Sequence, residues 1–344
     1  MHTLLRYGLK LIILLALATP APAQQNTSPT TPPAAQEQRS NPADTQTAPS
    51  TSAQTSTIQD SASRDQEGMF VFKKQVEEVV LHATVVDERR RLAAYLDRGA
   101  FTVLEDGQPQ TITSFHREDV PVAIGIVIDN SGSMRDKREQ VNRAVLNLIR
   151  AGNPQDQIFV VNFSQHAYLD QDFTSDIGLL EQALRQTSTR GSTALYDAVI
   201  ASAVHLENNT QLEKRILLVI TDGKEDMSQQ TLQEATRRLQ ERNGPTLYAI
   251  GLTGPEQQNE SREALQELAN ATGGSAFFPE SLDQVGEITR ALAHDIRSQY
   301  TIAYKPQNEK AAAYHPIVVE ARAPGYGRLT VRTRRGYYTG ESVR

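Results

Sequence analysis

Short apolar runs alternate with stretches of helical periodicity across residues 121–297. The apolar runs cover residues 122–128, 156–163, 216–220 and 246–250. Between them, apolar residues recur at intervals of three and four residues around Val141, Leu232 and Leu265, which is typical of helices. Alternating strands and helices predict a mostly parallel, doubly wound sheet with helices on both faces. In such α/β sheets, ligands bind beyond the carboxyl ends of the strands.

Strand patterns also occur on both sides of this region. They cover residues 76–86, 101–104, 111–115, 300–304, 317–321 and 329–333. Asp106-Gly107 predicts a turn between the second and third of these segments. A few strands need another layer to cover their apolar face. We therefore predict that residues 67–120 and 298–340 form one small β-sandwich, with the α/β domain (residues 121–297) inserted between them.

The first residues have the pattern of an export signal. Arg6 and Lys10 accompany a short apolar run at residues 11–18, and Ala21-Pro22-Ala23 matches an A-x-A cleavage pattern. Retention as a membrane anchor is the alternative, although the run is shorter than the roughly 20 residues that span a bilayer. We expect residues 1–23 to be removed and the protein to be periplasmic, on the cell surface or secreted, with no transmembrane span in the mature chain.

Residues 24–66 are mostly Thr, Ser, Pro, Ala and Gln. A segment with so few large apolar residues cannot bury enough surface to offset the entropy of ordering, so we predict a disordered linker.

Composition restricts the function. The formal net charge of -6 gives no basic field for nucleic acid. Cys is absent, which excludes disulfides, thiolate nucleophiles and Cys-based zinc sites. Any metal ion must therefore be held by oxygen atoms or His.

Asp129-Asn130-Ser131-Gly132-Ser133 follows the first apolar run of the α/β region directly. An extended turn places alternate residues on one side, so one carboxylate and two hydroxyls converge. Hard oxygen donors of this kind suit Mg²⁺ or Ca²⁺ rather than zinc or copper. Helix capping by Ser131 or Ser133 explains the same residues, so this motif alone is weak.

Two further segments favour a metal site over helix capping. Arg190-Gly191-Ser192-Thr193 forms a turn before a helical stretch, and Thr221-Asp222-Gly223 ends the apolar run at residues 216–220. D-x-S-x-S, a Gly-x-Thr turn and a strand-ending T-D-G, in this order, resemble the metal-ion-dependent adhesion site of von Willebrand factor type A domains. The resemblance implies a Rossmann-like fold and a Mg²⁺ ion, or Mn²⁺ or Ca²⁺ in its place. It implies that the ion is surrounded by Asp129, Ser131, Ser133, Thr193 and Asp222.

In that family pattern Ser131 and Ser133 are direct ligands, Thr193 binds directly or through water, and both Asp residues often act through water. Further polar residues are candidates for the rim of the site or for support of its loops, namely Asn130, Asp197, Glu225 and Asp226. A solvated loop is the alternative for Glu225 and Asp226.

The flanking segments resemble those of secreted bacterial von Willebrand A-like proteins. These carry an E-D-G-x-P-Q hairpin before the domain and R-R-G-Y-Y after it, here Glu105 to Gln110 and Arg334 to Tyr338.

No arrangement of residues predicts catalysis. Ser131 and Ser133 would be committed to the metal, no His lies near the three motifs in sequence, and a D-x-D phosphatase needs Asp at position 131. We therefore expect a binding protein and not an enzyme. Its protein partner is expected to offer Glu or Asp to the metal, as in the family that the chain resembles. A structural envelope protein, in which the metal only rigidifies the loops, is the alternative.

Overall fold

The computed structural model describes residues 78–117, 119–185, 189, 191–223, 225–252, 259–307 and 313–340. These residues all belong to one compact unit, Phe72–Arg344. The predicted export signal and linker, and residues 67–77, lie outside the described residues. Across the ranges that are described, no helix combines the length and the apolar character needed to cross a membrane.

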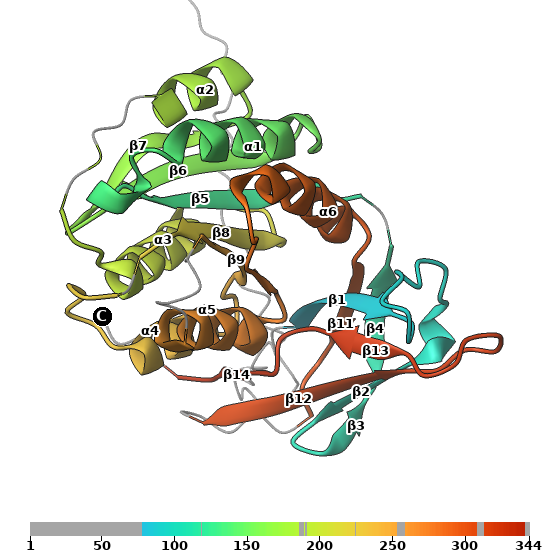
Figure 1. Ribbon diagram of the computed structural model, residues 1–344. Coiled ribbons are helices and arrows are strands. Elements are labelled where there is room, and N and C mark those ends of the chain that lie inside the picture. The colour runs from blue at the N-terminus through green and yellow to red at the C-terminus, as the bar shows by residue number, and fades with distance from the viewer. Residues whose placement is uncertain are drawn as a thin grey trace, which may run out of the picture. The chain divides into compact units, whose positions relative to one another are not determined.

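The central part is a six-stranded sheet with the strand order β10-β9-β8-β5-β6-β7 (Figure 1). Its strands are β5 (Ala123–Asp129), β6 (Gln157–Phe163), β7 (Ala167–Thr174), β8 (Arg215–Thr221), β9 (Thr246–Gly251) and β10 (Ala276–Phe277). Neighbours are parallel except β6 and β7, which are antiparallel. The predicted mostly parallel sheet is confirmed. The edge strand β7 was not predicted, because its largely exposed residues form no apolar run.

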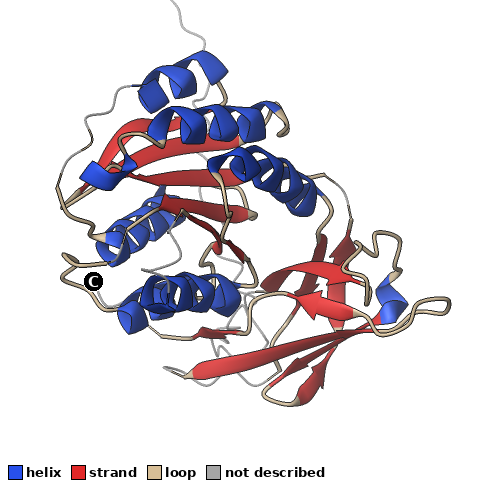
Figure 2. Cartoon of the chain, viewed as in Figure 1, coloured by secondary structure: helices blue, strands red, loops and turns tan. Residues whose placement is uncertain are grey.

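Helices cover both faces of this sheet (Figure 2). Their bounds are α1 (Arg138–Arg150), α2 (Ile177–Arg185), α3 (Leu195–Asn209), α4 (Leu232–Leu239), α5 (Asn259–Thr272) and α6 (Val285–Arg297). Helices α1, α2 and α6 share an apolar core with one face, and α3, α4 and α5 share a core with the other. Successive residues of the fully buried β5 face different cores, with Ile126 in the first and Val127 in the second. The continuous apolar run of this strand follows from its burial on both faces.

Strands from the two flanking segments form two four-stranded antiparallel sheets, ordered β13-β1-β11-β4 and β14-β12-β2-β3. These strands are β1 (Val79–Val86), β2 (Phe101–Glu105), β3 (Gln108–Gln110), β4 (Ile112–His116), β11 (Tyr300–Tyr304), β12 (Tyr314–Ala321), β13 (Thr330–Arg332) and β14 (Gly336–Tyr338). One apolar core joins both sheets and includes Leu81, Val103 and Ile302. The predicted β-sandwich with an inserted α/β domain is therefore confirmed.

The first hairpin differs from a simple pairing of the two segments that flank its turn. The chain turns at Asp106 and Gly107, both at positive φ, and β2 pairs with β3. Residues 112–116 instead form β4, which belongs to the other sheet and pairs with β11. An Asp-Gly turn fixes where the chain reverses, but the sheet that the next strand joins depends on a partner almost two hundred residues away, Ile302 for Phe115.

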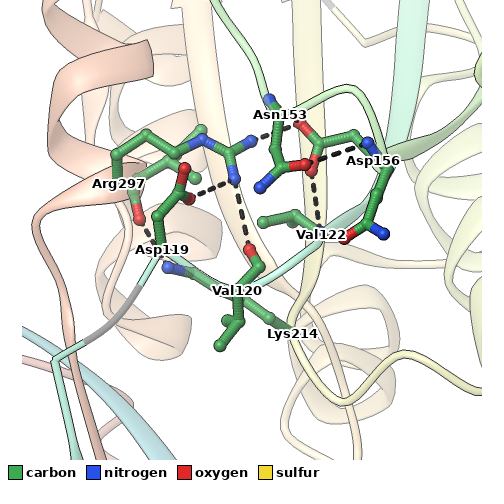
Figure 3. Close-up of polar contacts among 9 residues, drawn as sticks. Asp119, Val120, Val122, Asn153, Asp156, Lys214 and Arg297 are labelled. Carbon is green, nitrogen blue, oxygen red and sulfur yellow. Dashed lines mark hydrogen bonds and ion pairs between the residues drawn. The ribbon is translucent and has the colours of Figure 1, made fainter.

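The chain enters and leaves the inserted domain at neighbouring points. Arg297, the last residue of α6, donates to Asp119 Oδ1 at 2.7 Å and to the Val120 carbonyl at 3.2 Å (Figure 3). Its other terminal nitrogen pairs with Asp156, whose side chain is only 2% exposed. One guanidinium therefore joins the two connections of the domain.

Asp156 is itself held by the backbone. Its carboxylate accepts hydrogen bonds from the Val122 and Asn153 N–H groups, each at 2.9 Å. Nearby, the buried ammonium of Lys214 donates to the Ile296 carbonyl (Figure 3). The Asp156 carboxylate and the Lys214 ammonium therefore both have partners within the fold.

Candidate metal centre

Three loops meet at the carboxyl edge of the central sheet. Parallel pairing of β5 with β8 places Ile128 opposite Ile220, so Asp129 and Asp222 follow on adjacent strand ends. The third loop precedes α3, and its Gly191 carbonyl accepts a long contact of 3.5 Å from the Gly132 N–H. Its Thr193 carbonyl accepts from the Asp226 N–H at 3.1 Å. The fold thus brings the three motifs of the sequence to one place.

Their side-chain oxygens form a continuous group. Ser131 Oγ lies 3.1 Å from Ser133 Oγ, which donates to Asp222 Oδ1 at 2.8 Å. Gly223 brings Thr193 close, because a Cβ at position 223 would lie 2.9 Å from Thr193 Oγ1. The same Cβ would lie 3.4 Å from Asp129 Oδ2, so a side chain there would crowd both oxygens. All five residues predicted from the sequence lie together.

Asp129 is fixed by donors of the protein. Its Oδ1 accepts from the Ser131 N–H at 2.7 Å, and its Oδ2 accepts from Thr221 Oγ1 at 2.6 Å. Burial raises the pKa of Asp129, while the bonds from Thr221 and Ser131 act in the opposite direction and the nearby Asp222 raises it further. A buried carboxylate with a raised pKa beside a second carboxylate is a group that a cation would stabilise.

The donor set fits a hard divalent cation. It consists of two carboxylates and three hydroxyls, the oxygen ligands that Mg²⁺ and Ca²⁺ prefer. Ser131, Thr193 and Asp222 are buried, whereas Ser133 is exposed. The oxygens therefore form a cluster at the sheet edge, and Ser133 is its solvent-exposed member.

Residues 123–291 match the family model of the von Willebrand factor type A domain. These residues are a von Willebrand factor type A (VWA) domain. No curated protein matches the sequence.

Several solved structures are similar to part of the chain. BatB from Bacteroides thetaiotaomicron, described as a conserved hypothetical protein, is 18% identical and covers 51% of this chain and 97% of its own, with a TM-score of 0.43. The von Willebrand factor type A protein from Catenulispora acidiphila is 14% identical over 78% of this chain and 76% of its own, with a TM-score of 0.45. The vWF domain of the type V pili tip protein Mfa5 from Porphyromonas gingivalis is 12% identical over 52% of this chain and 95% of its own, with a TM-score of 0.44. All three identities are too low to transfer function.

Glu225 and Asp226 hold the third loop of the VWA domain. Glu225 Oε2 accepts from the Leu195 and Tyr196 N–H groups at 2.5 and 3.2 Å. Asp226 Oδ1 accepts from the Thr193 N–H at 2.8 Å. Both carboxylates are bonded to the backbone next to the candidate ligand Thr193, so they position that ligand.

Asp197 and Asn130 also tie loops together. The Asp197 carboxylate accepts from the Gln229 and Gln230 N–H groups, each at 3.0 Å, which joins α3 to the segment before α4. The Asn130 N–H donates to the Phe163 carbonyl at 2.6 Å and anchors the first loop to β6. These contacts tie the loops to the rest of the domain through hydrogen bonds of the chain itself.

Sequence reasoning assigned no role to three residues that contact the site. Thr221 orients Asp129 as described, Lys137 pairs with Asp222 Oδ2, and Arg138 Nη1 donates to the Asp129 carbonyl at 3.3 Å. Burial lowers the pKa of Arg138 to about 10, against the opposing effect of Asp129 and Asp170, so it remains charged at neutral pH.

The sequence did contain a signal for two of them. Lys137 is the N-cap of α1 and Arg138 is its first residue. Cations at a helix N-terminus are opposed by the helix dipole. Two consecutive basic residues at this position therefore indicate nearby carboxylates.

Proposed function

We propose that the VWA domain binds a protein partner through a divalent cation, Mg²⁺ or Mn²⁺ or Ca²⁺ in its place, in an exported protein. Its ligands would be Asp129, Ser131, Ser133, Thr193 and Asp222. The observation that carries the proposal is the cluster of converging side-chain oxygens at the sheet edge, of which Ser133 is exposed to solvent. VWA domains are interaction domains that often hold a divalent metal at this position.

The residues of the oxygen cluster favour binding of an anionic ligand by the cation. Both Asp129 oxygens already accept protein hydrogen bonds, which favours contact with the cation through water. The serine and threonine hydroxyls then supply neutral ligands. When bound, the cation would present positive charge at the open face, where a Glu or Asp of the partner could complete its coordination.

A hollow beside the oxygen cluster supports a protein as the partner. It measures about 270 Å³, and its lining includes Leu195 and Gly223 together with the acidic Glu225 and Glu260. Since Gly223 lines the hollow and also lies beside Thr193, a side chain next to the partner carboxylate could enter this hollow. Such a contact would give selectivity beyond attraction of the acidic group alone.

The structural alternative is weakened by the loop contacts. Glu225, Asp226 and Asp197 already bond the backbone of the third loop and of the segment before α4. These bonds hold the loops through the chain itself, which favours a role of the cation in recognition over a role in ordering the loops. Ser131 Oγ contacts Ser133 Oγ, and Ser133 donates to Asp222, so the described contacts of these hydroxyls are those of candidate ligands; this supports a binding domain without catalytic activity.

The test begins with a partner identified by cross-linking in envelope and extracellular fractions and then purified. Its affinity is measured in Mg²⁺, in chelator, and with Ser133→Ala in Mg²⁺. We expect chelator and Ser133→Ala each to weaken binding by about tenfold or more, because the chelator removes the cation and the substitution removes one of its ligands. Ser175→Ala, at an exposed serine outside the site, is the matched control. Equal affinity in all conditions would place the interface elsewhere.

A further inference from the structure

The candidate metal centre already contains a positively charged side chain, that of Lys137. The ammonium of Lys137 pairs with Asp222 Oδ2, while Ser133 donates to Oδ1 of the same carboxylate. We propose that Lys137 is an internal counter-ion for Asp222, which a divalent cation displaces when it binds. Lys137 would therefore set how tightly this VWA domain holds its metal. The inference rests on the proposed function, since it takes the metal centre as given.

Asp222 needs a positive partner in the metal-free protein. Its side chain is 0% exposed, and a buried carboxylate without a partner is strongly destabilising. The Asp129 carboxylate is stabilised differently. It accepts hydrogen bonds from the Ser131 N–H and the Thr221 hydroxyl, and the positive charge of Arg138 lies nearby. Each carboxylate of the site thus has a basic residue from the start of α1 beside it.

The two basic residues differ in their freedom to move. Arg138 is buried, with 4% exposure, and its guanidinium donates to the Asp129 carbonyl. The Lys137 side chain is 29% exposed and ends in a flexible four-carbon stem. Only Lys137 can move its charge into solvent without opening the core.

The backbone of Lys137 does not have to move for this release. Its N–H donates to the Met134 carbonyl and its carbonyl accepts from the Val141 N–H, each at 3.0 Å. These bonds fix the backbone between the short 3₁₀ turn (Gly132–Met134) and α1. Rotation of one side chain is sufficient, and the positive end of the α1 dipole favours its departure.

The consequence is a competition at Asp222. A divalent cation must separate Lys137 from Asp222, or bind beside a positive charge that repels it. Both cases lower the metal affinity relative to a site without the lysine. Removal of the Lys137 charge should therefore tighten metal binding, whereas removal of an ordinary ligand weakens it.

The experiment titrates Mg²⁺ into the chelator-treated full chain by calorimetry. Lys137→Met should bind Mg²⁺ about tenfold tighter or more than the wild type. Arg135→Met removes the same charge from an exposed residue of the same loop and should change the affinity by less than about twofold. Equal or weaker binding by Lys137→Met would overturn the inference while the metal site stands. An absence of Mg²⁺ binding in every protein would overturn the proposed function as well.

Two further measurements guard against a variant that does not fold without metal. Lys137→Gln keeps a hydrogen-bond donor without the charge and should also bind Mg²⁺ tighter than the wild type. In the wild type, acetylation of Lys137 followed by mass spectrometry should accelerate when Mg²⁺ is added, relative to the exposed Lys305. An acetylation rate that Mg²⁺ does not change would show that the lysine stays on Asp222.

Discussion

The two ends of the central sheet each hold a buried carboxylate against a basic side chain, but they use different cations. At the amino end, Asp156 pairs with Arg297, and their side chains are 2% and 16% exposed. At the carboxyl end, Asp222 pairs with Lys137, and their side chains are 0% and 29% exposed.

Arg297 is also bonded to Asp119 and Val120, so its guanidinium has several fixed partners, while Asp222 is the partner found for the flexible ammonium of Lys137. A planar guanidinium makes several directed bonds, whereas an ammonium is a mobile point charge. A buried carboxylate paired with arginine therefore fixes the fold at one end, whereas the pairing with lysine at the other end is the one that we propose a metal ion can displace.

The largest expected effect is at the amino end. Arg297→Met leaves the Asp156 charge buried and should lower the free energy of unfolding by about 3–5 kcal/mol. Urea denaturation measures this loss, and the Mg²⁺ affinity should not change. Arg143→Met, which removes an exposed i,i+4 pair with Glu139, is the control and should cost about 0.3–0.5 kcal/mol. A loss of stability as small as that of the control, or a change in Mg²⁺ affinity, would contradict the claim that the pair at the amino end stabilises the fold and does not affect metal binding.

A smaller effect is expected at the carboxyl end, where a substitution should change the metal affinity and leave the stability nearly unchanged. Gly223→Ala places a methyl group 2.9 Å from Thr193 Oγ1 and should lower the Mg²⁺ affinity by about tenfold by displacing this ligand. The free energy of unfolding should change by less than about 1 kcal/mol, because the neighbouring atom belongs to a side chain that can shift. Gly286→Ala, where a Cβ meets nothing within 4 Å, is the control and should leave metal binding unaltered. Unchanged Mg²⁺ affinity in Gly223→Ala would remove Thr193 from the ligand set.

The sequence was most informative where structure depends on neighbouring residues. The buried strands β5, β6, β8 and β9 appear as continuous apolar runs, because each is covered on both faces. Strand β7 lies at an exposed edge and has no such run, and the sheet that β4 joins is decided by its pairing with β11. These features depend on contacts between distant segments.

In the candidate site, too, the features set by neighbouring residues could be predicted, whereas those set by contacts between distant segments could not. Spacing within Asp129 to Ser133 is local, and the three motifs were sufficient to find the residues that gather at the sheet edge. The partner of Asp222 was not found, because Lys137 lies 85 residues away along the chain. Glu225 and Asp226 were considered as rim residues, but their bonds to the backbone of the third loop depend on folding around Thr193.

The two flanking motifs gain a physical explanation from the sandwich. Glu105 of the first motif is buried and accepts from the hydroxyls of Tyr304 at 2.5 Å and Tyr337 at 3.2 Å, the latter from the second motif. Arg334 of the second motif donates to the Glu241 and Gly244 carbonyls beyond the end of α4. The motifs therefore join the two sandwich sheets to each other and to the VWA domain.

The central claim is that the oxygens of the three loops bind one divalent cation, and calorimetric titration of Mg²⁺ into the chelator-treated protein tests it most directly. The wild type should bind one Mg²⁺ per chain, and Asp222→Asn should bind it roughly tenfold to a hundredfold more weakly. Circular dichroism of Asp222→Asn should match the wild type, because the residue follows the end of β8 and lies outside the apolar cores. A wild type that binds no divalent cation, or an Asp222→Asn variant with unchanged affinity, would contradict the account.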